Sequence, residues 1–115
     1  MIPQIFGTKK CKDTQKAIRF FKERRIQAQF IDLKEKTVSK GELNSIRQSI
    51  PIEELMDIDG KEYERLNLKY IRHNIEDKLL EYPLLFRTPI VRFKSRATIG
   101  YQPDIWKKWL LEIKQ

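Results

Sequence analysis

The chain has 115 residues, of which 24 are lysine or arginine and 16 are aspartate or glutamate, so its formal net charge is +8. This length provides one hydrophobic core and is too short for two, which predicts a single domain over residues 1–115. No stretch approaches the roughly 18 apolar residues of a membrane span, and lysines interrupt the N-terminal region where a signal peptide is apolar. We therefore predict a cytoplasmic protein with no membrane association.

Cys11 is the only cysteine, which excludes an internal disulfide and a cysteine-based metal cluster. We expect a free thiol in a reducing compartment, no metal site and no tightly bound cofactor. The positive charge favours anionic partners. However, the basic residues are spread along the chain and interleaved with acids, whereas a dedicated nucleic-acid binder gathers them on one face. The sequence therefore argues against direct nucleic-acid binding.

The first elements form a strand, helix and strand. Residues 3–6 are a short apolar run, and a helical pattern of apolar residues follows over about residues 11–24. Apolar residues then alternate with glutamines over residues 26–30, which predicts a strand with one buried face. Because a helix connects the two strands, we expect them to be parallel.

The middle of the chain is predicted to be helical. Ser39, with Glu42 three residues later, forms a capping box that opens a helix ending before Pro51. Three shorter helical pieces are expected at about residues 52–56, 62–66 and 75–82, the last with Asn74 as its cap and Pro83 as its stop. This gives an all-helical insert of about residues 37–84.

The C-terminal part is predicted to be a hairpin and a helix. Residues 89–93 and 97–101 are rich in β-formers and are separated by three polar residues. A last helix starts at Pro103. Its apolar stripe is expected to comprise Ile105, Trp106, Trp109, Leu110 and Ile113. The whole order predicts an α/β fold, with flanking helices on a four-stranded mixed sheet and the helical insert between its halves.

Cys11 lies between the first predicted strand and its helix. Free backbone N–H groups and the positive end of the helix dipole stabilise a thiolate at such a position. Thr14, one turn further on, could hydrogen-bond the sulfur. Three lysines lie within two residues of the cysteine: Lys9, Lys10 and Lys12. The alternative is a small buried residue in a tight turn, and position alone leaves both interpretations open.

The segment from Ile5 to Ala17 resembles the opening of the ArsC/Spx family, in which a strand and a glycine-containing loop deliver a cysteine at a helix start. A second match runs from Tyr82 to Val91, and Ala97 to Tyr101 is similar to the hairpin that follows. The resemblance covers essentially the whole chain and implies a thioredoxin-like fold.

The resemblance also implies that Pro89 is the cis-proline that lies opposite the cysteine in this fold. A cis peptide bond is plausible only before proline, so the residue type permits it. The alternative is an edge-strand proline with a trans bond. By the same resemblance, Thr88 and Pro89 shape the thiol site.

The chain departs from the family's arsenate reductases where these hold the oxyanion. Their three arginines correspond here to Asp57, Thr88 and Tyr101, none of which is cationic. Arg87 is one position early, and neighbours on a strand point to opposite faces, so it replaces a missing charge only if the backbone rearranges. The histidine four residues before the cysteine is Gly7 here. We therefore expect a substrate other than arsenate.

Redox-sensing Spx proteins carry a second cysteine where this chain has Thr14, which excludes an internal disulfide switch. What remains is attack by the thiolate, a mixed disulfide with glutathione or another thiol, and resolution by a second external thiol. We predict a thiol-dependent, glutathione-linked reductase with Cys11 as nucleophile and glutathione as co-substrate. Its candidate substrate-binding residues are Lys9, Lys10, Lys12, Thr14, Arg87, Thr88 and Pro89.

A second interpretation comes from another class of protein. The chain could be a non-catalytic regulator of the Spx type that docks on RNA polymerase through its basic surface and helical insert. Cys11 would then be vestigial or only sensory. A reductase needs an accessible, acidic thiol, whereas a docking protein tolerates the loss of that thiol.

Overall fold

The computed structural model describes the backbone of residues 2–113 and the side chains of residues 2–112. Its centre is a four-stranded sheet in the order β2-β1-β3-β4. The strands are β1 (Gln4–Gly7), β2 (Gln29–Asp32), β3 (Ile90–Phe93) and β4 (Arg96–Ile99). β1 is parallel to β2 and antiparallel to β3, and β3 is antiparallel to β4. The predicted four-stranded mixed sheet is therefore confirmed.

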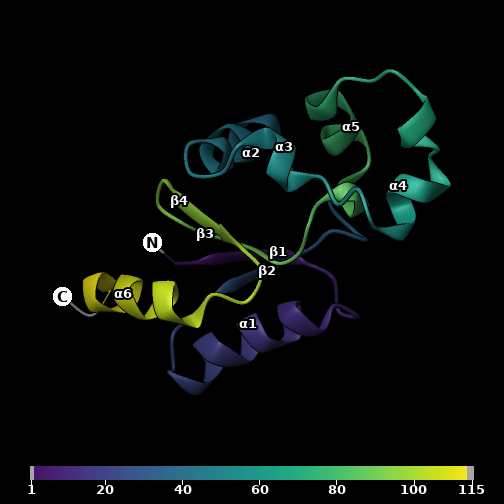
Figure 1. The fold of residues 1–115 in the computed structure, drawn as a ribbon. Coiled ribbons are helices and arrows are strands. Elements are labelled where there is room, and N and C mark those ends of the chain that lie inside the picture. The colour runs from purple at the N-terminus through teal and green to yellow at the C-terminus, as the bar shows by residue number, and fades with distance from the viewer. Residues whose placement is uncertain (1, 114–115) are drawn as a thin grey trace.

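Two helices cover one face of this sheet (Figure 1): α1 (Lys12–Glu23) and α6 (Pro103–Ile113). Trp106 is completely buried between α6 and the sheet, and its indole Nε1 donates a hydrogen bond to Thr98 Oγ1 at 2.9 Å. The predicted apolar stripe of α6 is correct for Trp106, Trp109 and Leu110, which are buried. It is wrong for Ile105, which is 40% exposed. Ile105 directly precedes Trp106 in sequence, so its side chain leaves the helix in a different direction from the buried one of Trp106. The side chain of Ile113 lies outside the described residues.

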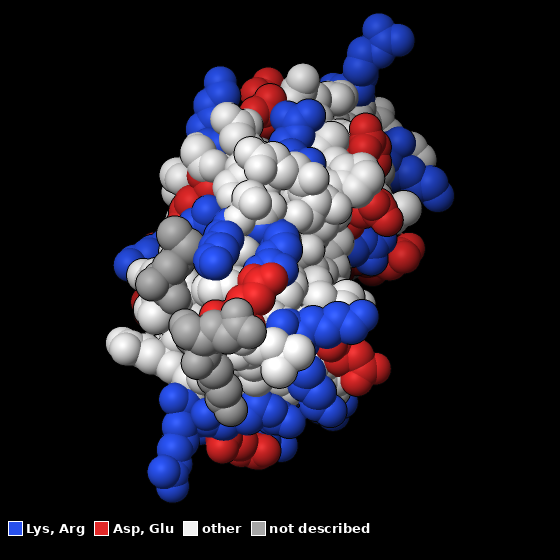
Figure 2. Space-filling model, turned by 90° about the vertical axis from the view of Figure 1, so that its left-hand side faces the viewer, with Lys and Arg blue, Asp and Glu red and all other residues white. Residues whose placement is uncertain are grey.

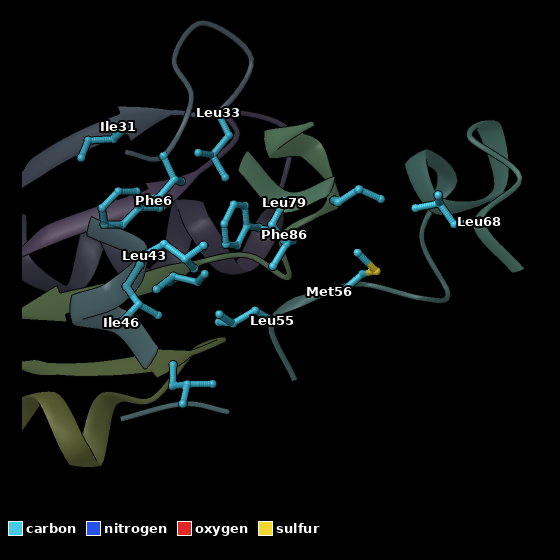
Figure 3. Packing of buried hydrophobic residues seen from close by; sticks show 14 residues of the cluster. Phe6, Ile31, Leu33, Leu43, Ile46, Leu55, Met56, Leu68, Leu79 and Phe86 are labelled. Atoms are coloured by element: carbon cyan, nitrogen blue, oxygen red, sulfur yellow. The ribbon is translucent and has the colours of Figure 1, made fainter. Parts of the chain in front are cut away.

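The opposite face is covered by the helical insert between β2 and β3 (Figure 1). Phe6 of the sheet packs in one cluster with Leu43 and Ile46 from the insert's first helix and with Leu79 (Figure 3). The helices of the insert are α2 (Lys40–Arg47), α3 (Ile52–Leu55), α4 (Lys61–Arg65), η1 (Leu68–Tyr70), α5 (Ile75–Glu81) and η2 (Pro83–Leu85). Within residues 2–113, no helix has both the length and the apolar character needed to cross a membrane.

Both predicted helix caps of the insert are confirmed. Ser39 Oγ accepts a hydrogen bond from the backbone N–H of Glu42 at 3.1 Å, and Glu42 Oε1 accepts one from the backbone N–H of Ser39 at 2.9 Å. Asn74 Oδ1 accepts a hydrogen bond from the backbone N–H of Asp77. These side chains satisfy backbone donors that have no partner inside the helix.

The second strand begins three residues later than the alternating pattern predicted. α1 ends in a left-handed turn at Arg25, whose φ is 59°, and the backbone N–H of Ile26 returns to Phe21 O at 2.9 Å. The start of the segment that the alternation of apolar residues predicted to be a strand therefore closes the helix instead. Sheet pairing begins only at Gln29, whose backbone N–H donates to Pro3 O at 2.8 Å.

The hairpin turn is shorter than predicted. Arg96 pairs with Phe93 in the sheet register, so only Lys94 and Ser95 connect the strands. Lys94 has a φ of 59°, the left-handed backbone that a tight two-residue turn requires. β4 consequently spans Arg96–Ile99 rather than residues 97–101.

Candidate functional site

Cys11 lies where the loop after β1 meets α1, and it is the N-cap residue of that helix. Its backbone N–H donates to Thr8 O at 3.2 Å, and its carbonyl accepts from the backbone N–H of Gln15 at 3.0 Å. The loop is thus a tight turn that brings the sulfur to the helix start. The thiol is free and half-buried.

Thr88 approaches the thiol from the other side of the site. Its hydroxyl donates a hydrogen bond to Cys11 Sγ at 3.2 Å, and its carbonyl oxygen lies 3.8 Å from the same sulfur. The peptide bond between Thr88 and Pro89 is cis, which confirms the prediction. The structure therefore brings Cys11, Thr88 and Pro89 together although the first two are 77 residues apart in sequence.

Thr14 lies beneath the cysteine on the first turn of α1 and is completely buried. Its Oγ1 has no hydrogen-bond partner of good geometry within the described residues. A Cβ atom at Gly7 would lie only 2.4 Å from this Oγ1, so Thr14 fills the space that a side chain at position 7 would need. The site therefore holds a buried hydroxyl donor that a thiolate could satisfy.

These contacts set the acidity of the thiol. Burial alone would raise the pKa of Cys11. The hydroxyls of Thr14 and Thr88 and the backbone N–H groups of Thr14 and Asp13 lower the pKa by more than burial raises it. The pKa of Cys11 is therefore below its usual value. The carboxylate of Asp13 lies 3.9 Å from the ammonium of Lys16, where this cation balances its charge. The stabilisation of the thiolate thus comes mainly from hydrogen-bond donors at the helix start.

Replacing Thr88 with valine is expected to raise the pKa of Cys11, because valine keeps the shape of threonine but cannot donate to the sulfur. Thr88→Ser, which keeps the hydroxyl, is the matched control and should retain most of the effect. The measurement is the rate of thiol alkylation as a function of pH for both variants. Identical profiles for wild type and Thr88→Val would show that this hydroxyl does not stabilise the thiolate.

The three predicted lysines are exposed, so solvent screens their charges. Of these, Lys10 lines a groove of about 370 Å³ that begins beside the thiol at Thr8 and Thr88. Lys9 and Lys12 do not line this groove. The sequence argument placed all three lysines around the sulfur, but the structure brings one of them to the adjacent groove.

The far wall of the groove comes from the helical insert and was not predicted. Leu84 and Phe86 provide an apolar surface, and Lys61 lies at the start of α4. Arg65 is paired with Glu62 at 2.7 Å, whereas Lys10, Lys34 and Lys61 form no ion pair within the described residues. No sequence motif marks these residues, because they meet only when the insert packs against the loop of Cys11. The groove is therefore apolar in part and carries an excess of positive charge.

Comparisons with known proteins show the family of the chain. The sequence profile of the ArsC family matches residues 6–109. The chain belongs to the ArsC family. No curated protein matches its sequence.

Solved structures show the same fold at low sequence identity. An arsenate reductase from Vibrio cholerae is 23% identical with a TM-score of 0.77, over 94% of this chain and 97% of that one. A protein named YffB is 17% identical with a TM-score of 0.78, over 92% and 96% of the two chains. An arsenate reductase related protein from Brucella melitensis is 18% identical with a TM-score of 0.65, over 96% and 95%. The thioredoxin-like fold predicted for this ArsC family member is thus confirmed.

The side chain of Arg87 in this ArsC family member points away from the groove beside the thiol. Arg87 Nη1 lies 3.6 Å from Asp57 Oδ1, and the backbone N–H of Arg87 donates to Leu55 O at 2.8 Å. Arg87 does not line the groove beside Thr88. The structure therefore directs its charge to Asp57 and not to the thiol. No cluster of three or more candidate metal ligands occurs in the described part of the chain.

Proposed function

We propose that this protein is a thiol-dependent reductase that forms a mixed disulfide between Cys11 and glutathione. The observation that carries the proposal is the placement of the thiol. It is a helix N-cap, it accepts a hydrogen bond from Thr88, and the buried hydroxyl of Thr14 on the same helix turn lowers its pKa. These donors favour a thiolate, which is the nucleophilic form of cysteine.

The proposed reaction needs no second cysteine in the chain. The Cys11 thiolate attacks the glutathione sulfur of a glutathionylated substrate, so that a Cys11–glutathione disulfide forms and the substrate leaves as a thiolate that takes up a proton. A second glutathione then attacks this disulfide, releases oxidised glutathione and a proton, and regenerates the Cys11 thiolate. The net reaction is a thiol–disulfide exchange: the substrate sulfur is reduced to a thiol, the sulfur of the one free glutathione is oxidised to a disulfide, and the enzyme returns to its starting state.

The groove beside Cys11 suits glutathione as the partner. Glutathione carries two carboxylates, and the three lysines of the groove without ion pairs provide positive charge for them. Its apolar wall at Leu84 and Phe86 allows the peptide backbone of the tripeptide to lie along the groove. Another anionic thiol would fit by the same chemistry, and a reducing compartment such as the cytoplasm would keep Cys11 free.

We further propose that arsenate is not the substrate. The positions of the family's oxyanion arginines hold Asp57, Thr88 and Tyr101, and the neighbouring Arg87 is paired with Asp57. An incoming oxyanion would find no guanidinium directed at it from these positions, because Arg87 is paired with Asp57.

The first test is the acidity of Cys11, measured from the rate of thiol alkylation against pH with Cys11→Ser as the blank. We expect the rate to reach half of its plateau at a lower pH than for an ordinary cysteine thiol, because the donors around the sulfur lower the pKa of Cys11. A midpoint at or above about 8.5, or alkylation only after unfolding, would contradict the reductase proposal.

A second candidate function rests on the surface of the helical insert. Three apolar side chains there are strongly exposed: Ile58 at 55%, Tyr70 at 79% and Ile71 at 49%. Exposed apolar groups on one segment are typical of a protein interaction site. This favours the alternative of a non-catalytic regulator that docks on RNA polymerase. Binding of purified RNA polymerase that is equal for wild type and Cys11→Ser, with a thiol of ordinary pKa, would support this alternative.

A further inference from the structure

A pocket distinct from the thiol site lies at the opposite end of β1. It has a volume of about 260 Å³ and is lined by Ile2, Gln4, Gln29, Arg92 and Lys94. Cys11 follows the last residue of β1, Gly7, whereas Gln4 is the first, so the length of the strand, about 10 Å, separates the two sites.

Three polar side chains of this pocket form a row across the sheet. Gln4 pairs with Gln29 of β2 on one side and with Arg92 of β3 on the other. Residues two apart on a strand share a face, so this row lies on the same face as Phe6 and Ile90, which the insert covers. The row thus continues the buried face of the sheet, and Arg92 reaches Ser45 of α2 from it.

The guanidinium of Arg92 is held in place by neutral partners. Its Nε donates to Gln4 Oε1 at 2.9 Å, its Nη2 donates to the same oxygen, and its Nη1 donates to Ser45 Oγ at 3.1 Å. Gln4 is fixed in turn, because its Nε2 donates to Gln29 Oε1 at 3.1 Å. These contacts orient the guanidinium but do not neutralise its charge.

The charge of Arg92 has no carboxylate partner in the described part of the chain, although its side chain is half-buried. Buried charges in proteins are normally paired, because removing an ion from water is costly. Three of the five guanidinium donors are used, which leaves one on each terminal nitrogen. The remaining N–H groups of this oriented guanidinium can donate to the oxygens of a carboxylate or phosphate, for which arginine is the usual partner.

From this geometry we infer that the pocket formed by Gln4, Gln29, Arg92 and Lys94 is a binding site for an oxyanionic group, a carboxylate or a phosphate, on a ligand of this protein. Lys94 adds a second positive charge at its rim, and Ile2 adds an apolar wall. This site is independent of the proposed reductase function, because it involves neither Cys11 nor the groove beside it.

The surroundings of the pocket fit an anionic ligand. Figure 2 views the molecule from the end at which both chain termini lie, the same end as the start of β1 in Figure 1, and shows basic side chains distributed over this face with fewer acidic ones between them. The net charge of +8 attracts anions and speeds their association with the protein. The pocket therefore combines an oriented guanidinium with the positive field of the whole chain.

The test is a titration of the whole protein with inorganic phosphate and, separately, with acetate, against chloride at equal ionic strength. The measured quantity is the NMR signal of the Arg92 Nε–H group. We expect a saturable shift with at least one of the two anions. Saturation by phosphate alone identifies a phosphate site, by acetate alone a carboxylate site, and by both a general oxyanion site. No saturable shift with either anion up to about 50 mM would overturn the inference.

Two variants distinguish a specific anion site at Arg92 from non-specific attraction of anions by the positive charge of the protein. Gln4→Glu keeps the size of the side chain but places a carboxylate on the guanidinium of Arg92, so we expect oxyanion binding to fall at least tenfold while the thermal midpoint stays equal or rises. Lys107→Gln lowers the net charge by the same amount on the exposed face of α6, and binding should persist. Equal losses in both variants, or unchanged binding in Gln4→Glu, would contradict the proposed site.

Discussion

Replacing Cys11 with serine should abolish the reductase activity. We expect the rate at which a glutathionylated peptide is reduced by glutathione to fall at least about 10³-fold, because a serine hydroxyl neither ionises at this site nor forms a disulfide. Mass spectrometry after exposure to oxidised glutathione should show one added glutathione on the wild type and none on Cys11→Ser. The substitution exchanges sulfur for oxygen at a half-buried N-cap position, where serine is a favoured residue, so the fold should be retained.

The outcome of this experiment separates the two candidate functions. If Cys11→Ser reduces the peptide as fast as the wild type, the thiol is not the nucleophile and the reductase proposal is wrong. If neither protein reduces it and both bind RNA polymerase equally, the docking function gains support. Equal thermal midpoints for the two proteins would show that Cys11→Ser is folded, so that a loss of activity is due to the missing thiol.

The position of the thiol could be predicted because it depends on short-range features of the sequence. A strand ending at a glycine, followed by helical spacing, places Cys11 at a helix start wherever the rest of the chain goes. The approach of Thr88 to the sulfur, by contrast, joins residues that are 77 apart. Only the resemblance to a family implied that contact, because local patterns carry no information on which distant segments meet.

The groove beside Cys11 shows where sequence reasoning ended. Its wall comes from the helical insert, whose four α-helices were each predicted, although α2 ends at Arg47, earlier than expected, and η1 and η2 were not predicted. Helix propensity and caps determine where such short helices begin and end, but their packing against the loop before α1 sets which side chains face the thiol. Lys61 therefore had no signal in the sequence, and the family match over Tyr82 to Val91 did not indicate that Leu84 and Phe86 line a groove beside the thiol.

The strand after α1 illustrates a competition between two local signals. Alternation of apolar residues starts at Ile26, but the left-handed turn at Arg25 and the return of Ile26 to Phe21 use this segment to close the helix. Closing the helix satisfies carbonyl groups that would otherwise lack a hydrogen-bond partner. This stabilises the chain more than extending the strand by a few residues at the edge of the sheet would. The predicted parallel pairing was nevertheless confirmed.

Replacing Gly7 with alanine should lower both the stability of the protein and the acidity of its thiol. The new Cβ atom would lie 2.4 Å from Thr14 Oγ1 and 2.6 Å from Thr14 Cγ2, inside their van der Waals contact. Thr14 is completely buried and has no free space to move into without displacing its neighbours, so we expect a loss of about 1–3 kcal/mol in the free energy of unfolding. A displaced Thr14 also stabilises the thiolate less, so the pKa of Cys11 should rise.

Chemical denaturation and the alkylation profile measure these two effects. Gly41→Ala is the matched control, because nothing lies within 4 Å of its added Cβ, and alanine inside α2 should leave stability unchanged or raise it by up to about 1 kcal/mol. In a Thr14→Ala background the two closest contacts disappear and only the 3.0 Å contact to the Cβ of residue 14 remains. Gly7→Ala should therefore cost less there, with a coupling of at least about 0.5 kcal/mol between the two positions. Equal costs in both backgrounds would mean that Gly7 is required for its backbone and not for the space that it leaves to Thr14.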